Sequence, residues 1–303
     1  MAASLKNVLL LGGAGTLGSP IIKALVANGT FTISVLSRPD SKSTFPTGLK
    51  RLTSDFTKPS LVESFKGQDA VVDLVAQASL DDCKRFIDAA LEAGVKRFIL
   101  SEFSGNMGNE ANVSIAPLFS HRVAVREYAR AKADAVPDFS FTTVSNGPFY
   151  DWAIKNGSIG FNLETHTATI YGDGNQPASV ATLSSVGQAV AGILAKPAET
   201  ANKSLFVASF TPTQNEILAV LEEVTGEKWE VNKIGIADSI TQGFQALGKG
   251  DMSGFVGVFM GSTYGPGNGN DFPKSGGLSN ELLGLPKEDM KAVTAAILEG
   301  KDV

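Results

Sequence analysis

Short apolar runs alternate with amphipathic segments of helical length through the first half of the chain. The apolar runs have no polar face, which is typical of strands that are buried on both sides of a parallel sheet. The segments between them repeat apolar residues every three or four positions, as helices packed on a sheet do. The predicted strands are 7–11, 32–36, 50–56, 69–76, 96–100 and 139–145, and the predicted helices are 17–26, 60–65, 80–93 and 118–135.

This alternation implies right-handed crossovers and a Rossmann-type α/β fold, a doubly wound parallel sheet, over residues 1–150. The regular pattern ends near 146–152. Residues 151–303 are expected to form a smaller C-terminal α+β substrate-binding region, from which some segments return to the sheet. The pattern predicts a strand at 167–171 and helices at 184–195 and 213–225. The glycine-rich segment 261–277 is interpreted as a surface loop, with a substrate lid as the alternative.

Composition narrows the class of protein further. The 303 residues are 43% hydrophobic and carry a formal net charge of −5, which disfavours a broad nucleic-acid-binding surface. No apolar stretch reaches the roughly 18 residues that a membrane helix needs. A single cysteine, Cys83, excludes an intramolecular disulfide and fits a reducing compartment. We therefore expect a cytoplasmic monomer or homodimer with a small-molecule substrate and with no nucleic-acid or membrane partner.

The segment GGAGTLG lies directly between the first predicted strand and the first predicted helix. Its glycines Gly12, Gly15 and Gly18 permit a tight turn, a close approach of backbone to a pyrophosphate, and close packing of helix on strand. The N-terminus of the helix adds free N–H groups and a positive dipole end. The pattern therefore predicts a dinucleotide site.

The residue that ends the second strand indicates which dinucleotide binds. An acid about 20 residues beyond the glycines favours NAD, whereas Arg38 stands there, with Lys42 close by. A guanidinium group pairs well with a 2′-phosphate, which predicts NADP(H). In the alternative, Asp40 binds the ribose and Arg38 belongs to a solvated loop.

Several motifs together resemble the NmrA-like and isoflavone reductase-like branch of the atypical short-chain dehydrogenases. They are GGAGTLG, the SRP after the second strand, KRFILSEFSGN, VREYARA, NGPF and IYGDGN. The resemblance implies a cofactor domain with a smaller C-terminal substrate domain, NADPH, and reduction of phenolic or quinone-methide-like metabolites. Some NmrA-like proteins instead bind the dinucleotide as redox sensors and catalyse nothing.

The resemblance also implies which residues would contact the cofactor. Gly12, Gly15, Thr16, Leu17 and Gly18 would hold the pyrophosphate, Arg38 and Lys42 the 2′-phosphate, and Val75, Ala76 and Gln77 the ribose; Ser101, Glu102 and Phe103, with Asn146, Pro148 and Phe149, would frame the nicotinamide. These positions lie at or beyond the carboxyl ends of predicted strands, which is where ligands of open α/β sheets bind.

The predicted catalytic residues depart from the family pattern. The plant reductases of this family carry a general acid/base lysine in the helix after the fifth strand, and alignment through VREYARA places Arg122 there. An arginine neutralises an oxyanion but does not readily move a proton. The adjacent His121 could move one, although neighbouring helix residues point about 100° apart. A packing or surface role for His121 is the alternative.

Other candidates for proton transfer are weaker. Tyr128 and Lys132 form a Y-x-x-x-K pair, but this pair is expected near the far end of its helix, away from the nicotinamide. Tyr150 could donate a hydroxyl, or simply pack, and His166 is expected to be solvated. Two histidines 45 residues apart and one cysteine predict no metal site.

The sequence therefore predicts an NADPH-dependent reductase of a small, aromatic or secondary-metabolite substrate. In that prediction, Arg122, with His121 or Tyr150, stabilises the substrate oxygen. An NADP(H)-binding regulator, or a member of the family that catalyses a non-redox isomerisation, remains the alternative because the family lysine is replaced.

Overall fold

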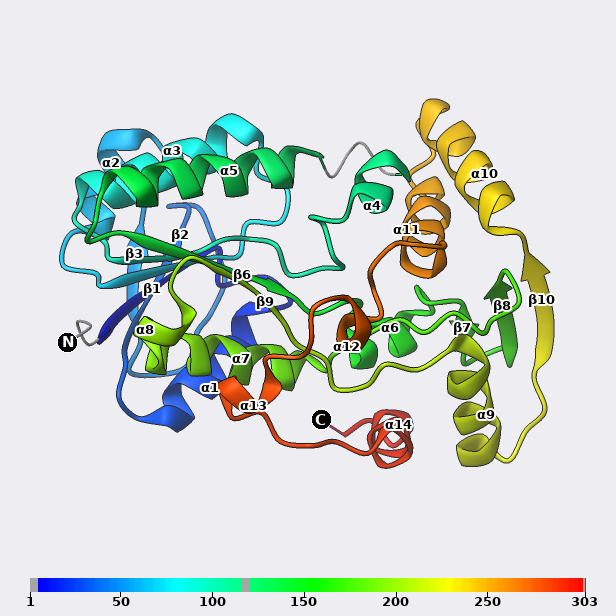
Figure 1. Ribbon diagram of the computed structural model, residues 1–303. Coiled ribbons are helices and arrows are strands. Elements are labelled where there is room, and N and C mark those ends of the chain that lie inside the picture. The colour runs from blue at the N-terminus through cyan, green and yellow to red at the C-terminus, as the bar shows by residue number, and fades with distance from the viewer. Residues whose placement is uncertain (1–4, 116–119, 302) are drawn as a thin grey trace.

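The computed structural model describes residues 5–115, 120–301 and 303, and a parallel sheet runs through its centre. The strands of this sheet are β1 (Asn7–Leu11), β2 (Thr32–Ser37), β3 (Lys50–Thr53), β4 (Ala70–Asp73), β5 (Arg97–Ile99), β6 (Ser140–Ser145) and β9 (Lys203–Phe206). Within the described residues they lie in the order β3-β2-β1-β4-β5-β6-β9. Figure 1 shows this sheet between helices on its two faces. The order reverses between β1 and β4, which is where such sheets bind ligands. The predicted Rossmann-type fold is confirmed.

Helices cover both faces of this sheet. One face packs against α1 (Gly18–Asn28) and α7 (Leu183–Ala195), and the other against α2 (Lys58–Phe65), α3 (Leu80–Glu92) and α5 (Ser120–Ala135). Alternate residues of β1 enter the two cores: Val8 and Leu10 enter the first, Leu9 and Leu11 the second. Burial of each such side chain contributes about 1.5–3 kcal/mol. The continuous apolar runs are therefore explained by two buried faces.

The edge strand β9 was not predicted from the sequence. Its segment, KSLF, has one buried residue, Leu205, and its first two residues are exposed. A strand paired on one side carries no continuous apolar run, so the pattern gives no signal for it. The predicted helix 118–135 begins at Ser120 in the structure, and residues 118 and 119 lie outside the described residues.

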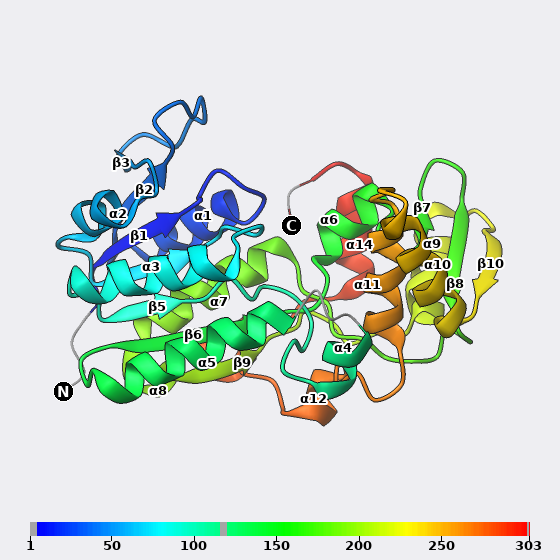
Figure 2. The ribbon, with the colours of Figure 1, turned by 90° about the horizontal axis from the view of Figure 1, so that it is seen from above.

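The C-terminal region forms a second body beside the carboxyl ends of the strands (Figure 2). A small sheet in the order β10-β8-β7 packs on a third core. Its strands are β7 (Phe161–Asn162), β8 (Thr167–Tyr171) and β10 (Glu230–Ile234). The remaining helices are α4 (Glu110–Ile115), α6 (Tyr150–Asn156), α8 (Pro197–Thr200), α9 (Gln214–Thr225), α10 (Ile236–Gly248), α11 (Gly254–Tyr264), α12 (Phe272–Ser275), α13 (Asn280–Leu283) and α14 (Met290–Leu298).

The interpretation of segment 261–277 as a surface loop is wrong for 261–264 and for the buried positions up to Phe272. Residues up to Tyr264 complete α11, and Asn268, Asn270 and Phe272 are buried. The asparagine side chains satisfy neighbouring backbone groups, so a polar, glycine-rich stretch is held inside the protein. Among the described residues, no helix is both long and apolar enough to cross a bilayer.

Candidate functional site

The glycine loop between β1 and α1 is closed on one side and open on the other. Gly12 has a φ of +84°, and a Cβ on Gly18 would lie 1.7 Å from the carbonyl oxygen of Gly13. A Cβ on Gly15 would meet only the Gly12 carbonyl oxygen, at 3.8 Å. The N-cap residue of α1, Leu17, supplies no side-chain hydrogen bond, so the first N–H groups of the helix have no side-chain cap. This open side can accept an anion.

The loop after β2 is exposed and is held from beneath by Arg51. Arg38 and Lys42 are exposed. The Arg51 side chain reaches across from β3, where Nε donates to Ser37 Oγ at 3.3 Å and Nη1 donates to the Ser43 carbonyl at 3.4 Å. Sequence reasoning missed Arg51. The sequence feature that could have identified Arg51 is a cationic residue in the predicted strand 50–56, which pairs with the strand that ends at Ser37.

The loop after β4 lies against the glycine loop. The Leu74 N–H donates to the Leu11 carbonyl at 2.9 Å, and a Cβ on Gly12 would lie 3.1 Å from Val75 Cγ2. The next residues, Ala76 and Gln77, are exposed. Arg122, from α5, donates from Nη2 to the Ala76 carbonyl. The structure therefore joins the predicted catalytic arginine to the predicted ribose loop.

Asp73 is a buried acid beneath this loop that sequence reasoning missed. It is 2% exposed, and one carboxylate oxygen accepts the Val75 N–H at 2.9 Å. Burial raises the pKa of Asp73 to about 7, against the opposing effects of that hydrogen bond and of the Arg122 charge. The sequence feature that could have identified Asp73 is an acidic residue at the end of the apolar run AVVD.

The segment after β5 contains a buried ion pair. Glu102 has a side chain 1% exposed, and Arg126 Nε donates to both of its carboxylate oxygens at 3.2 Å, with Nη2 donating to Oε2 as well. Burial raises the pKa of Glu102, and the Arg126 charge acts in the opposite direction. Sequence reasoning missed Arg126, although it lies within VREYARA, one helical turn after Arg122.

The segment after β6 is bonded directly to the segment after β5. The N–H groups of Asn146 and Gly147 both donate to the Ser104 carbonyl at 2.9 Å. Gly147 has a φ of +66°, and a Cβ there would lie 1.7 Å from the Ser179 carbonyl oxygen, so no other residue fits. Asn146 Oδ1 is buried and has no hydrogen-bond partner among the described residues. The structure therefore brings together the two segments predicted to frame the nicotinamide.

Within these two segments the side chains differ in exposure. Pro148 is buried, whereas Ser101, Phe103 and Phe149 are half-buried. The Pro148 carbonyl accepts the Ala181 N–H at 3.1 Å, which attaches the second segment to the C-terminal region.

Two of the other proton-transfer candidates lie in structural networks. Tyr150 is fully buried in the third core, where its hydroxyl is 2.6 Å from Thr294 Oγ1, and burial raises its pKa to about 12. Tyr128 donates to Asp88 Oδ1 at 2.7 Å, and Lys132 Nζ lies 2.9 Å from the same oxygen. The Y-x-x-x-K pair is therefore joined to helix α3. His121 lies half-buried in the first turn of α5.

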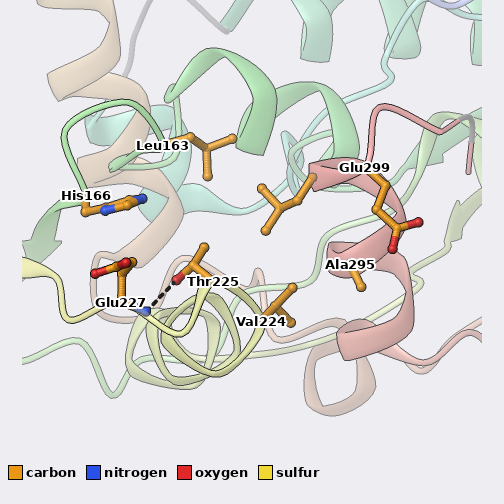
Figure 3. A pocket seen from close by; sticks show the side chains of 8 residues that line it. Leu163, His166, Val224, Thr225, Glu227, Ala295 and Glu299 are labelled. Atoms are coloured by element: carbon orange, nitrogen blue, oxygen red, sulfur yellow. Dashed lines mark hydrogen bonds between the residues drawn. The ribbon is translucent and has the colours of Figure 1, made fainter.

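His166 borders a separate hollow of about 500 Å³ in the C-terminal region (Figure 3). It is half-buried rather than fully solvated, and its ring centroid lies 5.4 Å from that of Trp229. The hollow is formed by α9, α14 and the β7–β8 turn, none of which carries a predicted cofactor residue. The described residues contain no group of three or more His, Cys, Asp or Glu that could hold a metal ion.

The strand order, with a glycine loop between β1 and α1, defines a Rossmann-type fold. The NmrA-like family model matches residues 4–248, so the chain belongs to the NmrA-like family. The family resemblance seen in the motifs is thereby confirmed.

Comparison with individual proteins agrees with the family. The chain is 35% identical to "Oxidoreductase aprR" of Aspergillus flavus over 97% of this chain and 99% of that one. A crystal structure of isoflavone reductase superposes with a TM-score of 0.77 at 20% identity, covering 96% of this chain and 99% of the other. The structure described as AtPrR2 with NADP+ and (+)pinoresinol gives 0.78 at 21% identity, covering 98% and 100%. At these identities, the two structures establish the fold.

Proposed function

We propose that the protein is an NADPH-dependent reductase of a small substrate, of aromatic or secondary-metabolite type. The observation that carries the proposal is the open glycine loop beside an exposed Arg38 at the switch point of the sheet. The A. flavus relative named as an oxidoreductase, which matches along nearly its whole length, supports the reaction class.

The residues present fit a dinucleotide phosphate. The space beside Gly15 is one that a side chain would fill, and the uncapped start of α1 opens onto it. Thr16 and Leu17 would complete the pyrophosphate contact with Gly12 and Gly18. Arg38 and Lys42 would bind the 2′-phosphate, on a loop that Arg51 orders.

The remaining contacts follow the order of the strands. Val75, Ala76 and Gln77 would lie along the ribose. Ser101, Glu102, Phe103, Asn146, Pro148 and Phe149 would surround the nicotinamide.

When bound, the reduced nicotinamide supplies a hydride for an electrophilic carbon of the substrate. The guanidinium group of Arg122 is a cation, and it stabilises negative charge that develops on the substrate oxygen. The imidazole of His121 supplies the proton. Tyr150 takes no part in the proposed reaction, because its hydroxyl is hydrogen-bonded to Thr294 in the third core.

One observation favours a second candidate, a dinucleotide-binding regulator or a non-redox isomerase. Arg122 stands at the position where the resemblance places the family lysine, and its guanidinium group is bonded to the Ala76 carbonyl. A cation held in this way binds and orients a ligand but does not transfer a proton to it.

The first experiment compares NADPH with NADH in fluorescence titrations of the wild type and of Arg38→Ala. We expect tighter binding of NADPH, lost selectively in the variant, while the matched control Arg130→Ala on the exposed face of α5 binds as the wild type does. Equal affinity for the two cofactors would contradict the NADP assignment.

The second experiment follows NADPH oxidation with a panel of phenolic ketones, enones and quinones. Oxidation with any of them supports the reductase. Tight binding of NADPH without oxidation would favour the regulator or the isomerase.

A further inference from the structure

Asn270 lies buried between α11 and α12, where its amide joins two distant parts of the chain. It is 4% exposed. Its Oδ1 accepts the N–H of Asn106 at 2.9 Å, and its Nδ2 donates to the carbonyls of Ser262 at 3.1 Å and Thr263 at 3.3 Å. These partners are an acceptor pair on one side and a donor on the other, so they fix the orientation of the amide. Asn106 belongs to the loop that follows Glu102.

The backbone of Asn270 reaches the other nicotinamide-facing segment. Its carbonyl accepts the Ser179 N–H at 2.8 Å, and the Ser179 carbonyl in turn packs directly on Gly147. Two residues along, the Ala181 N–H donates to the Pro148 carbonyl at 3.1 Å. One residue of the C-terminal region is thus connected to the segment after β5 by its side chain and to the segment after β6 by its backbone.

The phosphate end of the site is held by different contacts. The glycine loop is bonded to β2 through the Gly12 N–H and the Leu36 carbonyl, and the Arg38 loop is bonded to Arg51. These contacts lie within the first 53 residues of the chain. A change at Asn270 therefore acts on one end of the site only.

We propose that Asn270 is a positioning residue for the nicotinamide half of NADPH. The proposal rests on the proposed function, because it needs NADPH as the ligand. Asn270 holds the segments after β5 and β6 at a fixed separation, and it contributes nothing to recognition of the adenosine phosphates.

The test compares two ligands in the variant Asn270→Asp. The substitution keeps the shape and one acceptor oxygen but turns a carboxylate oxygen toward the Ser262 and Thr263 carbonyls. Dissociation constants are measured for NADPH and for adenosine 2′,5′-bisphosphate, which lacks the nicotinamide. We expect about a tenfold loss of NADPH affinity, with the bisphosphate affinity unchanged within about twofold. The emission of bound NADPH is expected to shift toward that of the free cofactor.

A second variant moves the amide without altering it. A Cβ at Gly105 would lie 2.8 Å from Asn270 Oδ1, so Gly105→Ala is expected to give the same selective loss. The matched control is Asn280→Asp. Asn280 makes a similar pair of bonds, with the Ala208 N–H at 3.2 Å and the Ala208 carbonyl at 2.7 Å, after the edge strand β9. It is expected to leave the ratio of the two dissociation constants unchanged.

The outcomes distinguish a failure of the role proposed for Asn270 from a failure of the proposed function. Equal losses for both ligands, or an unchanged ratio in both Asn270→Asp and Gly105→Ala, would overturn the role of Asn270 while leaving NADPH as the ligand. A wild-type protein that binds neither ligand would overturn the proposed function, and with it this role.

Discussion

The two ends of the proposed cofactor site lie at the same edge of the sheet but are built in different ways. The phosphate end consists of exposed backbone and cations whose supports are close in sequence. The nicotinamide end consists of buried and half-buried groups held by residues farther away in the sequence: Glu102 is paired with Arg126, 24 residues away, and Asn106 is bonded to Asn270, 164 residues away.

This difference between the two ends implies that cofactor affinity and orientation of the nicotinamide depend on different parts of the chain. A short local loop suffices to bind a dinucleotide, because it offers backbone N–H groups without help from the rest of the chain. In the proposed site, orientation of the nicotinamide ring depends on the C-terminal region, through the proposed role of Asn270. Variants at the phosphate end should therefore change cofactor affinity, and variants at the nicotinamide end should change how the nicotinamide ring is held.

The largest effect on NADPH binding is expected at Gly18. In Gly18→Ala the new Cβ would overlap the Gly13 carbonyl oxygen, so the loop must move, and NADPH affinity should fall by about 100-fold or more. The unfolding free energy should fall as well. Fluorescence titration and urea unfolding measure the two effects.

Gly15→Ala is the matched comparison at the open side of the same loop. Its Cβ meets no protein atom closer than 3.8 Å, so the unfolding free energy should be unchanged while NADPH binding weakens. A Gly15→Ala protein that binds NADPH as tightly as the wild type would show that the phosphates lie elsewhere.

At the nicotinamide end, the largest effect is expected from Arg126→Met, and it is an effect on stability. It leaves the Glu102 carboxylate buried and unpaired, which costs about 3–5 kcal/mol of unfolding free energy at neutral pH. Burial already raises the pKa of Glu102, so the carboxyl becomes protonated on acidification and the loss should shrink. Urea unfolding at pH 5 and pH 8 measures it.

The double variant Arg126→Met with Glu102→Gln serves as the control, because it removes the buried charge together with its partner. It should recover much of the stability at pH 8. A loss that is the same at both pH values in the single variant would contradict the explanation through charge.

Asp73 lies between the two ends and gives a prediction of the opposite sign. Its folded-state pKa of about 7 exceeds the ordinary value of 3.8, so the folded protein binds the proton more tightly than the unfolded chain. The wild type therefore loses stability as pH rises from about 4 to 7. Asp73→Asn should be more stable than the wild type by an amount that grows across this window, up to about 4 kcal/mol. A difference independent of pH, measured by urea unfolding, would contradict this.

The smallest effect is expected from Tyr128→Phe, which removes the bond to Asp88. The unfolding free energy should fall by about 1 kcal/mol, and the rate of NADPH oxidation should not change. Loss of turnover in a variant that still binds NADPH would return the Y-x-x-x-K pair to the active site.

The sequence sufficed to predict most of the sheet because buried strands and their glycine turn are local patterns. β1 was predicted to the residue, since the four apolar positions after Asn7 are buried, alternately in the two cores on either side of the sheet. β9 was not predicted, because an exposed edge strand has no such pattern. The same reason explains the glycine-rich segment, whose asparagines look like loop residues until their backbone partners are known.

For the candidate site, the sequence predicts the residues that follow a local pattern. Gly12, Gly15 and Gly18 were assigned to the pyrophosphate from their spacing; this assignment stays a prediction, and the open side of their loop leaves room for an anion. Arg126 and Asn270 were missed because their importance comes from contacts with residues far away in the sequence. An ion pair between two helix or loop residues leaves no periodic trace.

The late position of β9 has a consequence for how the protein is made. β6 ends at Ser145 and its partner strand begins at Lys203, with strands β7 and β8 and helix α7 between them. At about 5–20 residues per second, a ribosome takes several seconds to cover that interval. Until then β6 is an open edge, the kind of strand that pairs with other chains, and one core lacks α7. A stop codon in this interval would yield an unfinished, aggregation-prone sheet instead of a smaller nucleotide-binding protein.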